Sequence, residues 1–590
     1  MPFLPTSPSD LHDRGWDELD VILVTGDAYV DHPSFGAAVI GRVLEQAGFR
    51  IGIIAQPDWR ARDDFARLGR PRLFFGITAG NLDSMVANYT ANKRPRRKDD
   101  YAPGGKPGLR PDRAIIVYSN RLRETFGNVP IVLGGIEASL RRFAHYDFWD
   151  NALRRSILID SRADILVFGM GEQQVLEVAS RLKNRKALDA IPGTAVVARD
   201  AEALNDPVAL PSWEEVKGDK EAFNRAFRLM YEEQDPYRGR ALIQKHDTRY
   251  VVQFPPAIPL KPRELDQVFA LPYERAWHPS YDAAGGVPGF ETVRFSIISH
   301  RGCCGECAFC GLGLHQGRII QSRSRESVLR EAKLISERPE FRGTITDVGG
   351  PTANLYGARC TRWSKEGACK TMQCLMPGKC RNLDLGYGES IKLYHDMLAL
   401  PRVKHVFIES GLRYDLLLGD EAAGYLEQLC ACHVSGQLKV APEHTAVPVL
   451  HVMNKPGLAV YEAFEKRFRE TNRRLKKDQY LVNYFISGHP GCTLADTLEM
   501  SLYLLKRRIH PEQIQDFVPL PLTLSGTMFY TGRHPLTGKE VYVPSTPNER
   551  KMQRALIQWR NPKNLSLIRE ALHTIGKEHL FARFQKAQRG

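Results

Sequence analysis

Four of the chain's 11 cysteines lie in the eight-residue stretch CCGECAFC, at 303–310. In a chain without a recognisable secretory segment, thiols this dense favour metal binding or catalysis over disulfide bonding. Two overlapping spacings are present. Cys303, Cys307 and Cys310 give CxxxCxxC, whereas Cys304, Cys307 and Cys310 give CxxCxxC. Which thiols bind, and what they bind, decides the function.

The two spacings predict different metal sites. A ferredoxin-like CxxCxxC site would need a further cysteine soon after Cys310, and the following GLGLHQGR contains none. Three thiolates of CxxxCxxC can instead hold a 4Fe–4S cluster and leave one iron open, and an open coordination position distinguishes a catalytic metal site from a closed structural one. A zinc site completed by His315 is the alternative that the local spacing leaves open.

A second set of cysteines follows about fifty residues later. Cys360, Cys369, Cys374 and Cys380 are separated by eight, four and five residues, which is not a ribbon or knuckle pattern. Four thiols within 21 residues still favour a metal, either structural zinc or an auxiliary iron–sulfur cluster. Four free thiols in a loop are the alternative.

The elements that must position these thiols follow an α/β pattern. Short apolar runs alternate with helical periodicity, which predicts a parallel sheet covered on both faces. We expect residues 1–200 to form a Rossmann-like or flavodoxin-like domain and residues 201–290 to form a connector with a helical segment at 212–234. The strands expected in the first domain are 19–26, 49–57, 72–80, 113–120, 129–139 and 163–172.

The alternation of strand-like and helical segments starts again at residue 291. Six βα-type units are too few for a closed eight-stranded barrel and predict a partial barrel over residues 291–535, followed by a helical extension at 536–590. The first cysteine set directly follows the first expected strand, where βα folds place ligand and catalytic groups. The expected strands are 293–302, 343–350, 403–413, 436–444, 479–491 and 514–522.

A strand, then CxxxCxxC with an aromatic residue (Phe309) before the last cysteine, then five further βα units, resembles the radical SAM superfamily. The resemblance implies that Cys303, Cys307 and Cys310 hold a 4Fe–4S cluster whose open iron binds S-adenosylmethionine. It also implies reductive cleavage to a 5′-deoxyadenosyl radical, with electrons from a donor such as flavodoxin or ferredoxin. The cofactors carry the difficult chemistry, and the protein binds and orients them.

The resemblance assigns further cofactor contacts to successive strand ends. Gly349 and Gly350 match the turn that receives the methionine amine, although Pro351 replaces the usual acid. Ser410 and Arg413 follow the third strand, where an arginine could pair with a carboxylate through two hydrogen bonds. Glu443 follows the fourth strand, where it could accept hydrogen bonds from ribose hydroxyls.

Long strings narrow the resemblance to the YgiQ family of radical SAM proteins. They include DAYVDHPSFG at 27–36 and VLGGIEASLRRFAHYDFWDN at 132–151. The resemblance implies a first domain like the cobalamin-binding domains of related enzymes, but the cobalamin motif D-x-H-x-x-G is not met at Asp31, His32 and Gly36. It gives the fold and the cofactors and does not give the substrate.

Composition limits the partners only loosely. Lys and Arg outnumber Asp and Glu by 82 to 68, which permits a polyanionic partner without requiring one. No apolar run approaches a membrane span, and we expect a cytoplasmic enzyme that modifies RNA or protein. The competing hypotheses are a non-catalytic nucleic-acid-binding protein stabilised by zinc or iron–sulfur, and an electron-transfer protein.

Overall fold

The structure is a computed structural model that describes residues 2–201, 204–511 and 514–589. The chain divides into two compact units. The first comprises Met1–Ile298, Leu314–Glu331 and Arg362–Ala368, and the second comprises Ser299–Gly313, Ala332–Thr361 and Cys369–Gly590. In the described parts of the chain, no helix is both long enough and apolar enough to cross a membrane.

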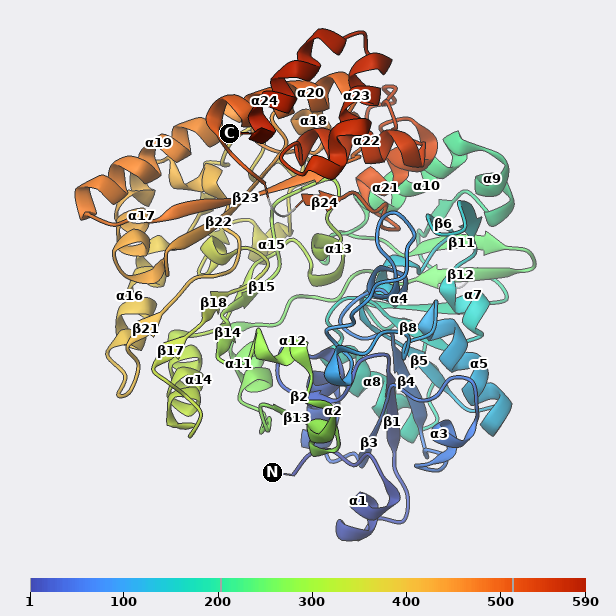
Figure 1. Ribbon diagram of the computed structural model, residues 1–590. Coiled ribbons are helices and arrows are strands. Elements are labelled where there is room, and N and C mark those ends of the chain that lie inside the picture. The colour runs from blue at the N-terminus through green and yellow to red at the C-terminus, as the bar shows by residue number, and fades with distance from the viewer. Residues whose placement is uncertain (1, 202–203, 512–513, 590) are drawn as a thin grey trace. The chain divides into compact units, whose positions relative to one another are not determined.

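The first unit is built on a nine-stranded sheet of order β10-β11-β12-β9-β8-β5-β4-β1-β3 (Figure 1). Five neighbouring strands, β3, β1, β4, β5 and β8, are parallel, and their order is that of flavodoxin-like folds. The predicted α/β class is therefore confirmed. The strands are β1 (Val21–Thr25), β3 (Ile51–Ala55), β4 (Phe74–Thr78), β5 (Ile131–Leu133), β8 (Ile165–Val167), β9 (Thr194–Ala198), β10 (Val208–Leu210), β11 (Leu242–His246) and β12 (Arg249–Gln253).

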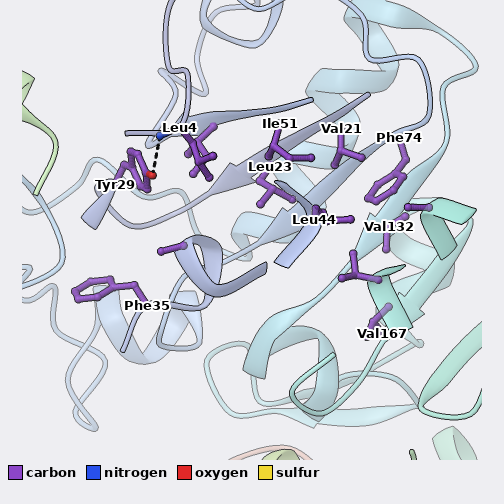
Figure 2. Packing of buried hydrophobic residues seen from close by; sticks show 14 of the residues in the cluster. Leu4, Val21, Leu23, Tyr29, Phe35, Leu44, Ile51, Phe74, Val132 and Val167 are labelled. Atoms are coloured by element: carbon purple, nitrogen blue, oxygen red, sulfur yellow. Dashed lines mark hydrogen bonds between the residues drawn. The ribbon is translucent and has the colours of Figure 1, made fainter. Parts of the chain in front are cut away.

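Helices line both faces of this sheet, which is why its central strands are apolar along their whole length. Helix α2 (Gly36–Gln46) packs beside α8 (Glu172–Lys183), and α5 (Ala114–Phe126) packs beside α7 (Ile157–Ser161). Figure 2 shows part of the core, in which Val21 and Leu23 of β1 lie among residues from β3, β4 and α2. The amide of Leu4 donates to the hydroxyl of Tyr29 at 3.2 Å and fixes the first residues against this core.

One predicted strand of the first unit is a helix. Residues 113–120 lie mainly in α5, whose buried positions are Ala114, Ile115, Tyr118, Ser119 and Leu122. Those positions recur with helical spacing, so the helical period overrides the β-branched run Ile-Ile-Val. The other short elements of this unit are α1 (Pro8–Asp13), β2 (Val30–Asp31), α3 (Asp63–Ala66), α4 (Ser84–Asn88), α6 (Gly135–Leu140), β6 (His145–Asp147) and β7 (Ala152–Arg154).

Residues 201–290 differ from the predicted connector because they belong to the first unit. Strand β12 pairs antiparallel with β9 and β11, and β10 pairs parallel with β11, so this stretch extends the sheet. The helical segment expected at 212–234 is two helices that meet at Asp219. The elements here are α9 (Trp213–Gly218), α10 (Lys220–Glu232), α11 (Pro262–Phe269), β13 (Ala276–Trp277), α12 (Pro288–Glu291) and β14 (Ser296–Ile298).

The second unit pairs its strands largely in chain order. Strand β17 (Thr344–Ile345) is parallel to β21 (His405–Val406), a parallel bridge joins Leu412 to Val440 of β22, and β22, β23 and β24 are parallel neighbours. The six-unit partial barrel stays a prediction. The other elements are β15 (His300–Arg301), β18 (Asp347–Gly349), α16 (Tyr387–Leu398), α17 (Ala423–Gln428), β22 (Gln437–Glu443), α18 (Val447–Val452), α19 (Leu458–Leu475), β23 (Tyr480–Ser487), α20 (Leu494–Arg507), β24 (Ile514–Asp516) and α21 (Leu524–Thr531).

The end of the chain forms three helices that pack with α20. They are α22 (Pro547–Ile557), α23 (Leu565–Thr574) and α24 (Phe581–Arg589). Leu494 and Leu498 of α20 share a core with Leu556 of α22 and Leu572 of α23. This shared core anchors the helical extension to the last βα unit.

Candidate active site

The loop that carries the first cysteine set is fixed by hydrogen bonds to distant parts of the second unit. It follows β15. The Ala308 amide donates to the Met453 carbonyl at 3.0 Å, and the Ala308 carbonyl accepts from the Ser525 amide at 2.9 Å. The side chain of Asn454 donates to the Glu306 carbonyl at 2.9 Å. The residues just after α18 and the first turn of α21 therefore hold the backbone between the thiols.

The three thiols of this loop are only partly accessible to solvent. Burial raises the pKa of Cys303 to about 11 and that of Cys310 to about 12, and the nearby thiol of Cys307 raises both further. The Cys310 amide donates to the Cys307 carbonyl at 3.0 Å, which turns the chain between these two residues. Metal binding needs deprotonated thiolates, so a bound cation would offset the cost of this burial.

The donor set fits an iron–sulfur cluster chemically. Three soft sulfur ligands on one loop suit iron–sulfur or zinc rather than magnesium or calcium. Among the described residues, no group of three His, Cys, Asp or Glu side chains already stands in metal-binding geometry. The assignment of Cys303, Cys307 and Cys310 as ligands therefore stays a prediction that rests on spacing, donor chemistry and the fixed loop.

Arg413 lies against this loop. Its Nη1 donates to the Cys307 sulfur at 3.6 Å, while Nε and Nη2 donate to Asp415 at 2.9 and 2.6 Å. Burial lowers the pKa of Arg413, but Asp415 and the thiols raise it by more, so the guanidinium stays charged. Asp415 thus accepts the paired hydrogen bonds of Arg413 that were expected, from the sequence, to bind a cofactor carboxylate. Only Nη1 of Arg413 is directed at the cysteine loop.

Asp347, the first residue of β18, joins this strand to the segment after β21. One Asp347 oxygen accepts from the amides of Glu409 and Ser410 at 2.8 and 3.0 Å, and the other accepts from the Ser410 hydroxyl. The hydroxyl of Ser410, a predicted cofactor contact, therefore donates its hydrogen bond to a residue of β18. Glu409 in turn pairs with Lys439 of β22 at 2.8 Å.

The Gly349–Gly350 turn packs against Ser299 and His300, at the start of β15. A Cβ at Gly350 would lie 2.6 Å from the His300 carbonyl oxygen, and one at Gly349 would lie 2.9 Å from the Ser410 hydroxyl. The Ser299 amide donates to the Gly349 carbonyl at 2.8 Å. At Gly350 a side chain would meet the His300 backbone, and at Gly349 it would meet the Ser410 side chain, so this turn packs closely at both positions.

Glu443 stands at the end of β22 in an uncommon backbone conformation. Its φ is +67°, at a register shift in the pairing with β23. Its carboxylate is buried and lies 3.6 Å from the ammonium of Lys455, which is also buried. Burial raises the pKa of Glu443, while Lys455 and Arg413 lower it. Strained residues of this kind cluster at functional sites, and Glu443 is also close enough to influence Cys310 electrostatically.

An apolar group supports the cysteine loop. Phe309 packs on Ala446, Val449 and Met453, and its ring meets His489 edge to face with ring centroids 6.0 Å apart. Burial lowers the pKa of His489 to about 3, so this histidine is neutral in the fold. The aromatic residue of the motif thus anchors the loop to the second unit's core.

Two histidines singled out by the sequence have other partners, and both lie in the first unit. The Nδ1 of His315 lies 3.0 Å from the Ser139 hydroxyl. The Nδ1 of His32 accepts from the Ser34 amide at 3.1 Å, and its Nε2 lies 3.4 Å from Arg275. His32 is buried, so its ring packs inside the first unit.

The first sheet's own ligand crevice is filled by the chain. In folds with this strand order, ligands bind where β1 and β4 diverge. There the Asp27 carboxylate accepts from Arg110 at 2.6 Å and from the Asn81 amide at 2.7 Å. A Cβ at Gly80 would lie 2.0 Å from Asp27. Burial raises the pKa of Asp27 to about 6, and Arg110 opposes that rise.

The residues that form hydrogen bonds or ion pairs with the predicted cofactor contacts were not predicted from the sequence. Asp347, Asp415 and Lys455 each pair with a residue assigned from the family resemblance. A weak signal existed in GTITDVGG, where an acid at 347 precedes the glycine pair. Asp415 lies only two residues after Arg413, but nothing in the sequence shows that the two side chains meet.

Comparison with known proteins identifies the family. Residues 3–296 match the family model described as Radical SAM N-terminal, and residues 512–587 match a domain of unknown function (DUF3362). A UPF0313 protein of Clostridium botulinum is 50% identical over 583 residues, covering 98% of this chain and 91% of the relative. A UPF0313 protein of Methanocella arvoryzae is 52% identical over 574 residues, covering 97% and 95%.

Solved structures show a more distant likeness. The radical S-adenosylmethionine methyltransferase TsrM from Kitasatospora setae is 15% identical with a TM-score of 0.48, over 85% of this chain and 74% of that one. The cobalamin-dependent S-adenosylmethionine radical enzyme OxsB is 11% identical with a TM-score of 0.48, over 90% and 57%. On its sequence relatives and its N-terminal match, the chain belongs to the UPF0313 family of radical SAM enzymes.

Proposed function

We propose that this enzyme binds a 4Fe–4S cluster through Cys303, Cys307 and Cys310 and binds S-adenosylmethionine beside it. The observation that carries the proposal is the fixed loop after β15, which gathers three thiols in the CxxxCxxC order in a chain of a radical SAM family. When bound, the pair of cofactors supplies a 5′-deoxyadenosyl radical for hydrogen abstraction from a substrate.

The chain's own residues provide charge and shape around the loop. Arg413 places a permanent cation and an N–H donor against the sulfur of Cys307. Gly349 and Gly350 let the backbone approach closely, and the buried Glu443–Lys455 pair offers an acceptor and a donor on the side of Cys310. These groups suit the recognition of a zwitterionic amino acid moiety and a ribose.

The substrate is proposed only by class. We infer an RNA or protein side chain, because the chain is basic overall and its surface can attract an anionic macromolecule. An electron donor such as flavodoxin or ferredoxin would supply the electron that reductive cleavage needs.

The test is cleavage of the proposed cofactor. The protein is reconstituted anaerobically with iron and sulfide and reduced, S-adenosylmethionine is added, and 5′-deoxyadenosine is measured. Cys303→Ala is expected to lose cluster iron and activity. Cys304→Ala is the matched control one residue away and is expected to keep both. No cleavage by the reconstituted wild type, with an unaltered cluster spectrum, would instead favour a non-catalytic metal-stabilised nucleic-acid-binding protein.

A further inference from the structure

We propose that Cys360, Cys369, Cys374 and Cys380 form a second, closed metal centre with four thiolate ligands in the second unit. These four cysteines are separate from the three of the 303–310 loop, and all four are partly accessible. The ligand chemistry is that of a tetrathiolate, which suits zinc or an iron–sulfur cluster equally.

A short antiparallel ladder brings the two ends of this loop together. Strand β19 (Arg359–Cys360) pairs with β20 (Leu383–Asp384), so that Cys360 lies opposite Leu383. The Leu383 amide donates to the Cys380 carbonyl at 3.0 Å. Cys360 and Cys380 are twenty positions apart in sequence, and the β19–β20 ladder therefore holds both at the base of the loop, where its two ends meet.

Backbone hydrogen bonds also turn the chain at the other two cysteines, Cys369 and Cys374. The Cys380 amide donates to the Cys374 carbonyl at 2.8 Å, and the Met372 amide donates to the Cys369 carbonyl at 2.9 Å. The thiol of Cys374 is near enough to those of Cys369, Cys380 and Cys360 to interact with each electrostatically. Cys374 is thus the thiol with the other three nearby, although among the described residues the four do not yet stand in metal-binding geometry.

Residues 369–382 of this loop have little apolar burial of their own. Within the fully described stretch 369–382, Leu375 is the one buried residue, and no helix or strand falls there. Loops longer than about 12–15 residues without secondary structure of their own are uncommon in compact domains unless they are functional or disordered. A metal bound by four ligands supplies folding free energy that a segment without a core lacks.

The charges around the thiols complement such a centre. Four thiolates on a divalent cation carry roughly two net negative charges. Within residues 369–382 there is no acid and there are three cations, namely Lys370, Lys379 and Arg381. A loop of four protonated thiols would gain nothing from this excess, whereas a dianionic centre is stabilised by it.

The proposed centre borders the first cysteine set. The buried Cys304 interacts electrostatically with both Cys303 and Cys374, and Glu306 is within electrostatic reach of Cys374 as well. Cys304 therefore has one thiol of each set nearby. Because all four ligand positions would be filled by protein, the centre would hold the loop beside the first site rather than bind substrate.

Metal analysis of full-length variants tests this proposal. In the triple variant C303A/C307A/C310A, purified without reconstitution, we expect about one equivalent of zinc, or iron with matching sulfide. Adding Cys374→Ser should remove that metal, whereas adding Cys432→Ser at an exposed cysteine outside both sets should leave it. A folded triple variant without zinc or iron would overturn the proposal, as would retention of the metal after Cys374→Ser.

A second measurement covers the case in which the triple variant fails to fold. Native wild-type protein is alkylated with and without a chelator, and each cysteine is quantified by mass spectrometry. We expect the four thiols to be protected until chelation, while Cys432 reacts throughout. Reaction of all four at the rate of Cys432 before chelation would refute the site. Neither measurement depends on S-adenosylmethionine cleavage, so failure of the proposed function would be distinguishable.

Discussion

A single methyl group at Gly350 tests the geometry of the candidate active site. The Cβ of Gly350→Ala would lie 2.6 Å from the His300 carbonyl oxygen and 2.7 Å from its Nε2, whereas ordinary contacts begin at 3.4 Å. His300 has no room to yield, because it is fully buried and its Nε2 lies 3.1 Å from the Thr352 carbonyl. The end of β18 must therefore move.

The size of the effect follows from this clash. Adding a methyl group to a packed site costs about 1–3 kcal/mol. For a unit of this size, each 1 kcal/mol lowers Tm by about 2–4 °C, so Tm should fall by roughly 2–12 °C. A displacement of about 1 Å at a positioning turn can cost about 100-fold in rate, and we expect a loss of that order in 5′-deoxyadenosine formation.

Gly411→Ala is the matched control, because a Cβ there meets no atom within 4 Å. Both variants are reconstituted identically, and Tm, iron content and 5′-deoxyadenosine formation are measured. Gly350→Ala should keep its iron, since Gly350 lies outside the cysteine loop, but lose stability and activity. If Gly350→Ala melts and reacts like Gly411→Ala, the close approach of this turn to His300 is not a feature of the working enzyme.

Two further predictions concern charge. Arg413→Met removes a cation and a hydrogen-bond donor from Cys307 and should lower the reduction potential of the reconstituted centre, whereas Asp415→Asn removes an anion and should raise it. Each 1.4 kcal/mol of altered interaction corresponds to about 60 mV for a one-electron couple. Shifts of the same sign in a redox titration would contradict this prediction. Burial lowers the pKa of His300 and His444 to about 4, so the unfolded chain binds protons below pH 6.5 that the folded protein excludes. Stability should be full above pH 6.5 and fall by about 2 kcal/mol per histidine at pH 5, and an unchanged Tm of the metal-free protein over this range would refute it.

The alternation of apolar runs and helical patterns was enough to predict the α/β class. Buried parallel strands such as β1 are continuously apolar and are bounded by turn residues, so they are visible in a single sequence. The cysteine loop was also predictable in position, because its thiols directly follow a strand. In both cases the signal lies within about ten consecutive residues.

The extension of the first sheet was not predictable in this way. Strand β12 belongs to the sheet because it pairs with β9, about fifty residues earlier in the chain. Such pairing depends on register between distant segments, which local periodicity does not encode. The same limit made α5 look like a strand, since a short apolar run fits either period until its buried face is known.

The site shows that residue types alone do not reveal which partners each side chain already has. Ser410 and Arg413 carry the groups that a cofactor would need, yet the Ser410 hydroxyl is bound by Asp347 and the fork of Arg413 by Asp415. Those acids act on the site by fixing its strand ends and by leaving one N–H edge of Arg413 directed at Cys307. A charge that is pre-oriented by a partner costs less to reorganise when a ligand binds than a mobile one. The partners are therefore as much a part of the site as the residues that the motif names, and substituting Asp347 or Asp415 should perturb it without removing any predicted ligand.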